Sequence, residues 1–168
     1  MGTGAPLPLT PHEMQTVRSA IKSEFHNLAD SFQLTSWPTE QYNCIAWAAE
    51  DQGRWWWPDI DGESFWPQGI ERNETILDFI TAFRTLGYET CESHDLEIGY
   101  EKVAIFAIGD RVKHMGRQLS SGTWTSKLGP WWDVGHDSVD EIEAPHYGRR
   151  VQILKRTSLN ISIIPSGT

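Results

Sequence analysis

Cys44 has the surroundings of a reactive thiol. It lies in the segment Gln41–Ala49 (Gln-Tyr-Asn-Cys-Ile-Ala-Trp-Ala-Ala), where polar residues precede the cysteine and helix-forming residues follow it. This pattern predicts a helix that begins at or near Cys44. The free backbone N–H groups and the dipole of a helix start stabilise a thiolate, and the same N–H groups stabilise an oxyanion formed beside it. The segment predicts a nucleophilic cysteine; the alternative is a buried thiol that only fills space.

His114 is the candidate general base for that thiol. It stands at the head of a predicted strand, with the cationic residues Lys113 and Arg117 close to it. Nearby positive charge disfavours the imidazolium, so we expect a neutral ring that takes the thiol proton and returns it to a leaving group. The alternative is a surface histidine on an edge strand.

Two supporting roles also have candidates. Asp133 and His136 are candidates to orient the histidine, and a carboxylate such as Asp133 could fix its tautomer, although residues 133–143 are also typical of an acidic surface loop. Gln41 is the candidate side-chain amide for the oxyanion. The neighbouring Asn43 is expected to cap the helix instead.

The histidines and acids of the chain lack the spacing of a metal site. The side chains that could serve as ligands are His94, Asp95, His114, His136, Asp137 and His146. None of them forms a His-Glu-x-x-His pattern, and Cys44 and Cys91 are not in a Cys-x-x-Cys pair. The sequence therefore predicts no metal and no cofactor.

A tryptophan-rich loop, residues 53–69, follows the Cys44 helix directly. Successive side chains of an extended chain alternate in direction, so its three consecutive indoles cannot all point the same way. We expect Trp55 or Trp57 to be buried and Trp56 or Trp66 to lie at the rim of the Cys44 cleft. Trp56, Trp57 and Trp66 are then the candidate substrate-binding residues, and the alternative is that the indoles form a small core of their own.

The composition limits the classes of partner. The chain has 168 residues, of which 39% are hydrophobic and 22% charged, as in a soluble globular protein. Its net charge of −9 argues against nucleic acid or an anionic membrane as the partner. It contains neither a signal-peptide pattern nor a run of about 20 apolar residues. We therefore expect a cytoplasmic protein, with a signal-independent route of secretion left open.

The elements that must position these residues change character along the chain. Predicted helices span residues 11–32, 44–52 and 74–86, and predicted strands span 102–108, 114–119, 123–128 and 148–156. Helices followed by an antiparallel sheet predict an α+β fold. We expect residues 1–11 to form a flexible tail and residues 12–168 to form a single domain.

This order of elements resembles the papain-like fold in its small bacterial form, the NlpC-type and CHAP-type peptidases and amidases. The matching pieces are Asn43-Cys44-Ile45-Ala46-Trp47, Val103-Ala104-Ile105-Phe106, the segment 114–122 that begins with the histidine, and Trp124-Thr125-Ser126-Lys127. In that fold a third polar residue often lies twelve residues after the histidine, which here is Ser126. The families usually have His, Asn, Gln or an acid there, so the serine is a departure. The chain also looks like an uncharacterised bacterial family with an Asn-Cys-Ile-Ala-Trp-Ala motif.

The resemblance implies a cysteine hydrolase. It would be a peptidase, amidase or deamidase that acts on a peptide, protein or amide substrate through a thioester at Cys44. His114 would be its general base, and Ser126 or Asp133 would orient the imidazole. The alternative function is a degenerate papain-like module of binding or immunity type, which uses the tryptophan-rich loop to hold a protein partner.

Overall fold

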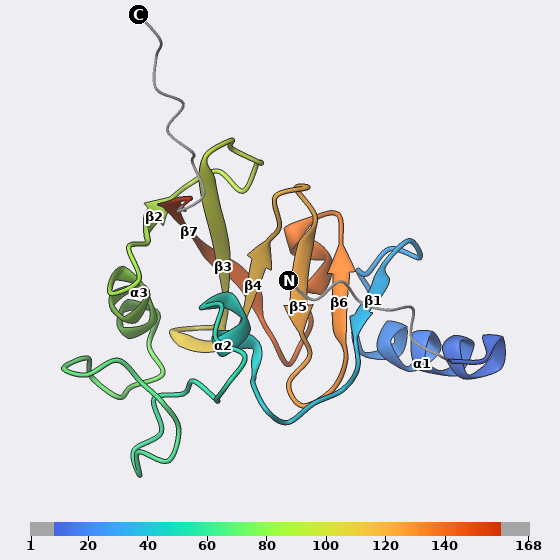
Figure 1. The fold of residues 1–168 in the computed structure, drawn as a ribbon, viewed down its shortest axis with the longest axis horizontal. Coiled ribbons are helices and arrows are strands. Elements are labelled where there is room, and N and C mark those ends of the chain that lie inside the picture. Colours follow the sequence, from blue (N-terminus) through green and yellow to red (C-terminus); the bar gives the residue numbers. More distant parts are fainter. Residues whose placement is uncertain (1–8, 159–168) are drawn as a thin grey trace, which may run out of the picture.

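One antiparallel sheet organises the protein (Figure 1). The computed structural model describes residues 9–158, and in them seven strands follow the order β1-β6-β5-β4-β3-β7-β2. The strands are β1 (Gln33–Ser36), β2 (Glu89–Cys91), β3 (Tyr100–Ile108), β4 (Arg111–Gln118), β5 (Trp124–Lys127), β6 (Asp133–His136) and β7 (Arg149–Thr157). The helices are α1 (Pro11–Glu24), α2 (Cys44–Ala48), α3 (Ile76–Arg84) and the short 3-10 helix η1 (Val139–Ile142). The predicted α+β class is confirmed.

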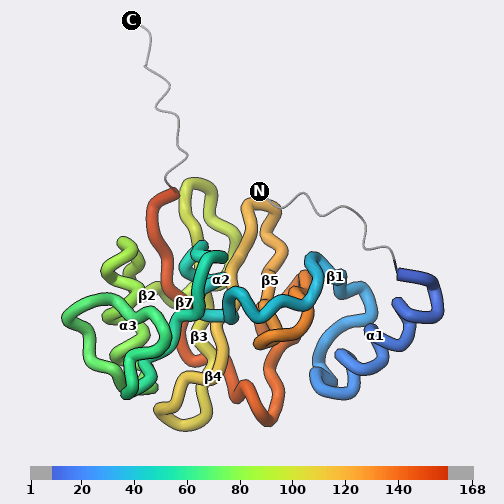
Figure 2. The backbone as a smooth tube through the Cα atoms, turned by 60° about the horizontal axis from the view of Figure 1, so that its bottom comes forward, coloured from blue at the N-terminus to red at the C-terminus, as the bar shows by residue number. Residues whose placement is uncertain are grey.

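The sheet is buried on both faces, and each face has its own hydrophobic cluster. The α2 face is covered by α2, α3 and the tryptophan-rich loop, and its cluster includes Ile45, Phe79 and Met115. The α1 face is covered by α1 and η1, and its cluster includes Phe25 and Trp124. In both ribbon and tube, α1 lies beside β1 at one end of the sheet and α3 lies at the other end (Figure 2).

The central strand β3 shows why the two faces are so distinct. Val103 and Ile105 belong to the cluster on the α2 face, whereas Ala104 and Phe106 belong to the cluster on the α1 face. Successive side chains of a strand point to opposite faces, so a continuous apolar run serves both clusters at once. The nearly continuous apolar run of residues 102–108 predicted a buried strand, and the structure buries residues 103–107 on its two faces.

α1 begins where the sequence predicts and ends earlier. Thr10 caps it with a reciprocal capping box to Glu13. The helix stops at Glu24, and the following residues fold back beneath it, where Arg18 and Lys22 donate hydrogen bonds to the backbone carbonyls of that segment. The expected continuation to residue 32 is wrong because turns bury the apolar side chains of 25–32 more fully than a straight helix would.

α2 is short because its C-terminus closes tightly. Asp51 N–H bonds to Ala46 O at 2.8 Å and Glu50 N–H bonds to Trp47 O at 3.0 Å, which is the Schellman arrangement. Glu50 stands in the position usually taken by glycine, with φ of 61°. Its carboxylate pairs with Arg156 at 2.8 Å, an ion pair that helps hold the strained residue in place.

Two strands lie where the sequence predicted loops. β1 occupies part of the connector before α2, and β6 occupies the start of the predicted acidic loop 133–143. All four residues of β6 are buried between β1 and β5. The loop prediction failed because four residues are too few to show a period, and only pairing with β5 makes them a strand.

The tryptophan-rich loop forms a compact lobe with its own aromatic core. The Trp56 ring lies 4.7 Å from that of Phe65, and the Trp66 ring lies 4.9 Å from that of Phe79 on α3. Trp56 is 3% exposed and Trp66 4%, whereas Trp55 is 37% exposed. The expectation that Trp56 or Trp66 lines a cleft is therefore wrong, because both are enclosed.

The predicted tail and the predicted single domain can be compared with the structure only in part. The expected tail, residues 1–11, lies mostly outside the described residues, and α1 begins at Pro11. That residues 12–168 form a single domain stays a prediction. None of the described helices combines the length and the apolar character needed to cross a membrane.

The lobe gives a direct test of its role in stability. Replacing Trp56 with alanine should cost about 3–5 kcal/mol of unfolding free energy, because it empties a large buried aromatic site. Trp55→Ala is the matched control, because the Trp55 indole is partly exposed. This variant should lose clearly less unfolding free energy than Trp56→Ala. Urea denaturation followed by far-UV circular dichroism measures both. Equal losses for the two variants would contradict the packing described for the lobe.

Candidate functional site

Cys44 is the first residue of α2, as predicted. Asn43 caps the helix by accepting a hydrogen bond from Ala46 N–H at 3.1 Å. The same side chain bonds to both the N–H and the C=O of Trp56, which ties the tryptophan-rich lobe to the start of α2. Asn43 is thus structural. The Gln41 side chain is exposed, and its oxyanion role stays a prediction.

The thiol of Cys44 is buried, and burial controls its ionisation. Cys44 is 7% exposed and belongs to the apolar cluster of the α2 face. Burial raises its pKa to about 11, although backbone N–H groups of Met115 and Ile45 and the charge of Lys127 oppose the rise. The expected thiolate is therefore absent near neutral pH. The loss of hydration on burial outweighs the backbone N–H groups that contact the sulfur.

His114 lies on the opposite face of the sheet. In the pairing of β3 with β4, His114 is opposite Phe106 and Met115 is opposite Ile105. Paired residues share a face, so His114 points with Phe106 to the α1 face, and the two rings are 5.4 Å apart. Met115 points with Ile105 to the α2 face, where Cys44 lies.

The expected contact between Cys44 and His114 is therefore wrong. The residue of β4 that faces the Cys44 helix is Met115, one position along the strand. Because strand side chains have a period of two, an offset of one residue moves a side chain through the sheet to the other face. The imidazole cannot take the thiol proton across the sheet.

His114 instead begins a buried hydrogen-bonded chain on the α1 face. Its Nε2 lies 3.0 Å from Ser126 Oγ, and Ser126 Oγ lies 3.0 Å from Nε2 of His136. The other ring nitrogen of His136 lies 2.8 Å from Ser138 O. Gly116 leaves room for this chain, since a Cβ there would lie 3.4 Å from Ser126 Oγ. Ser126, which the resemblance places twelve residues after the histidine, is thus the partner of His114, and His136 continues the chain beyond it.

The acceptor at the end fixes the direction of this chain. Ser138 O only accepts, so Nδ1 of His136 carries a proton and its Nε2 accepts from the Ser126 hydroxyl. Ser126 Oγ then accepts from Nε2–H of His114, which leaves Nδ1 of His114 as a bare lone pair. That nitrogen is buried without a hydrogen-bond partner among the described residues. Burial lowers the pKa of both imidazoles, for His114 well below 6.5, and its neighbours His136 and His146 add to this.

A different polar cluster lies beside Cys44 on the α2 face. Tyr42 donates a hydrogen bond of 3.0 Å to Asp133 Oδ2, and Lys127 Nζ lies 4.0 Å from Asp133 Oδ1. Lys127 is fully buried and also donates to the carbonyls of Gly129 and Trp131. Burial raises the pKa of Asp133 above its usual value and, together with the Asp133 charge, raises that of Tyr42 to about 12. Asp133 is therefore not an orienting residue for His114, because the sheet lies between them.

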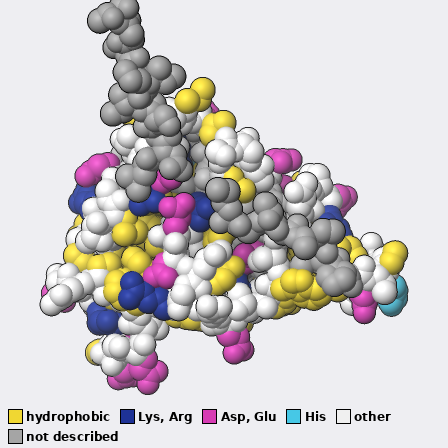
Figure 3. Space-filling model, viewed as in Figure 1, with side chains coloured by type: hydrophobic (Ala, Val, Ile, Leu, Met, Phe, Trp, Pro, Cys, Tyr) yellow, Lys and Arg dark blue, Asp and Glu magenta, His cyan; other side chains and the backbone are white. Residues whose placement is uncertain are grey.

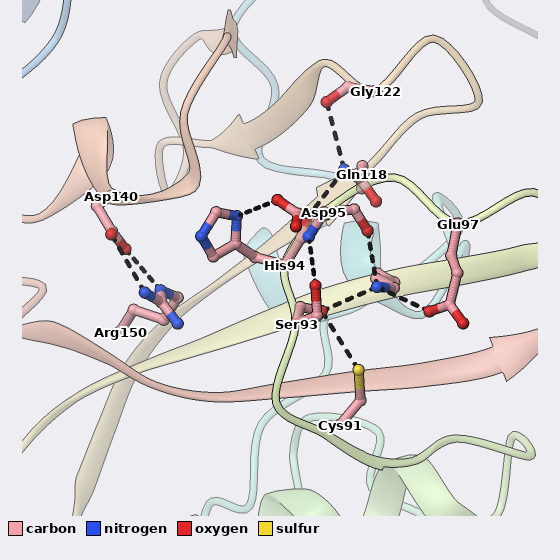
Figure 4. Close-up of polar contacts among 10 residues, drawn as sticks. Cys91, Ser93, His94, Asp95, Glu97, Gln118, Gly122, Asp140 and Arg150 are labelled. Atoms are coloured by element: carbon pink, nitrogen blue, oxygen red, sulfur yellow. Dashed lines mark hydrogen bonds and ion pairs between the residues drawn. The ribbon is translucent and has the colours of Figure 1, made fainter.

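The second cysteine has a more open environment. Cys91 is partly exposed, and its thiol lies 3.3 Å from Ser93 O in the segment that follows β2 (Figure 4). The buried ammonium of Lys102 fastens this segment by donating to the carbonyls of Ser93 and Asp95. Cys91 is the more accessible of the two thiols.

Several residues of these clusters were not predicted. Within residues 9–158 no three His, Cys, Asp or Glu side chains are grouped to hold a metal ion. Lys127 and Tyr42 were missed because charge and polarity suggested exposed positions. Tyr147, whose ring stacks on His114 at 4.2 Å, was missed because nothing in its local sequence connects it to β4.

The hydrogen bond between Tyr42 and Asp133 can be tested by removing one hydroxyl. Tyr42→Phe should lower the unfolding free energy by about 1.5–3 kcal/mol, as expected for losing a hydrogen bond to a charged group. Tyr100→Phe is the control, because Tyr100 is 40% exposed. It should change stability by less than about 0.5 kcal/mol. Chemical denaturation at pH 7 compares the unfolding free energies of the two variants. If Tyr42→Phe has the stability of the wild type, the hydrogen bond to Asp133 does not stabilise the cluster.

Comparison with known proteins gives the family of the chain. No curated protein and no solved structure matches it. One family model, described as "Domain of unknown function (DUF7689)", matches residues 33–155, from β1 to the second half of β7. The match includes both polar clusters and the tryptophan-rich lobe. The chain therefore belongs to the DUF7689 family.

Proposed function

We propose that the protein is a binding module on a degenerate papain-like fold, and that it holds a protein partner through the tryptophan-rich lobe. The papain-like assignment draws support from the order of elements, since the helix that begins at Cys44 packs on β4 and β5. The observation that carries the proposal is the separation of Cys44 from His114 by the sheet. Without a base in contact, a thiol with a pKa of about 11 is a poor nucleophile near neutral pH.

The lobe has the properties of a preformed binding surface. Its buried indoles hold the backbone, and its outer residues remain exposed: Ile60 is 91% exposed, and Leu77 on the adjoining α3 is 66% exposed. Hydrophobic side chains gather over α3 on this side of the molecule (Figure 3). A rigid support lowers the entropy cost of binding, and exposed apolar side chains on it favour contact with another protein.

Thiol labelling tests the loss of catalytic chemistry. In the native protein at pH 7, iodoacetamide should modify Cys91 much faster than Cys44, because Cys91 is accessible and Cys44 is buried as a neutral thiol. His114→Ala should leave the Cys44 rate unchanged, provided that the variant folds. Mass spectrometry of the labelled peptides measures both rates, and urea-unfolded protein, where both cysteines react, is the control. If Cys44 is labelled faster than Cys91 and His114→Ala slows that labelling, the result would contradict the proposal and favour a cysteine hydrolase.

Site-specific photocrosslinking tests the binding surface. A photoreactive residue placed at Ile60 or at Leu77, in the cells that naturally make the protein, should give a discrete protein adduct. The same residue at Gln15, an exposed position of α1 at the far end of the sheet, is the control. The adduct should depend on these positions because exposed apolar side chains stand there beside the buried indoles of the lobe. Adducts from Gln15 alone would place the partner elsewhere and contradict the proposal.

A further inference from the structure

The chain of His114, Ser126 and His136 lies beneath a segment that returns along the α1 face. This return segment, residues 137–148, contains η1 and packs Val139 and Ile142 into the cluster of that face. Its first contact with the chain is Ser138 O, which accepts from His136, and its last is the Tyr147 ring. That ring is parallel to the His114 ring within 4° at a centroid distance of 4.2 Å. Both imidazoles are thus covered by the same segment.

The return segment is also held by contacts that do not involve the histidines, in its middle at Asp140 and Glu141 and at its end at Gly148. Glu141 accepts from Ala29 N–H at 2.8 Å, and Arg150 pairs with Asp140 at 2.6 Å. Gly148 passes so close to β3 that a Cβ there would lie 2.0 Å from Ala107 O, and its φ is 76°. These contacts define where the segment closes, whereas the imidazoles contact it near its two ends, at Ser138 and Tyr147.

An added proton has no satisfactory place in this chain. If it binds Nδ1 of His114, it forms an N–H group that has no acceptor. If it binds His136, then Nε2 of His136 becomes a donor to Ser126, and the Ser126 hydroxyl must turn to His114 or lose its acceptor. Each arrangement leaves one buried N–H or O–H group unpaired, in addition to a buried positive charge, and both are costly.

The groups around the chain do little to offset this cost. His146 and Tyr147 of the return segment flank His114, and a charged His146 adds repulsion. Asp137 and Glu141 lie near His136 and favour its charged form, but burial outweighs them. The other surroundings are apolar, with Phe106 from β3 and Trp124 from β5, and with Ile21, Phe25 and Leu28 from α1 and the turns after it.

We propose that this chain is an acid-sensitive latch, which keeps the return segment closed while both imidazoles are neutral and lets it open when they take up protons. An opened segment exposes the rings to water, where each has a pKa near 6.5. In the closed form the pKa of each ring is lower. The open form therefore binds more protons below pH 6.5, so opening is favoured as the pH falls from about 6.5 toward the closed-form pKa values. Above pH 7 the latch stays closed.

Hydrogen exchange of the full chain between pH 5 and 7.5 tests the latch, with rates corrected for the pH dependence of chemical exchange. The opening constant of peptides from the return segment should rise by up to about tenfold per pH unit for each imidazole, and so up to about 100-fold for two. Peptides from β3 should keep their protection over this range. Loss of protection in both regions together would mean global acid unfolding and would overturn the latch.

Two variants assign the effect to the chain. His114→Gln keeps a hydrogen-bond donor toward Ser126 and does not titrate. It should therefore reduce the pH dependence of the opening constant of the return segment to about tenfold per pH unit at most. His12→Gln, at an exposed position of α1, is the matched control and should keep the full dependence. If the opening constant of the return segment has the same pH dependence in His114→Gln as in the wild type, the proposal is overturned. Should His114→Gln not fold, the comparison of return-segment and β3 peptides in the wild type decides alone.

Discussion

The alternation of side chains along β4 and β5 is the constraint on which the rest of the structure depends. Both strands are buried on both sides, so each residue belongs to one of two separate interiors. A shift in register by one residue would exchange the side chains of the two faces completely, and neither interior could accommodate the side chains of the other face. The position of His114 on the α1 face and of Met115 on the α2 face follows from this single geometric rule.

The two interiors keep their polar groups in different ways. On the α2 face Lys127 and Asp133 face each other, and Tyr42 supplies a further hydrogen bond, so charge is offset locally. On the α1 face the imidazoles stay neutral and pass hydrogen bonds in one direction to a backbone carbonyl. Both arrangements give most of their buried polar atoms partners, and each leaves one atom without a hydrogen bond among the described residues, Asp133 Oδ1 on the α2 face and His114 Nδ1 on the α1 face.

Local signals in the sequence predicted the features that depend on local chemistry. The predicted helix starts at Pro11, which Thr10 caps, and at Cys44 are confirmed. The strands β3, β4 and β7 were also predicted, because their apolar or alternating patterns extend over enough residues. The four-residue β5 was predicted because the Ser120-Ser121-Gly122 turn before it marks a hairpin. β1 and β6 were not predicted, because each is four residues long and acquires its structure from its neighbours in the sheet.

By itself the sequence determined which residues of one strand share a face. His114 and Ser126 stand on different strands, so their shared face depends on the register of β4 with β5, and the structure places the two side chains 3.0 Å apart. Only the tertiary structure decided which face that is, and hence that Cys44 lies on the other. The period of a strand defines two sides without saying which of them a helix will cover. That choice depends on where α2 packs, and it is made by contacts between residues far apart in the chain, such as Cys44 with Met115.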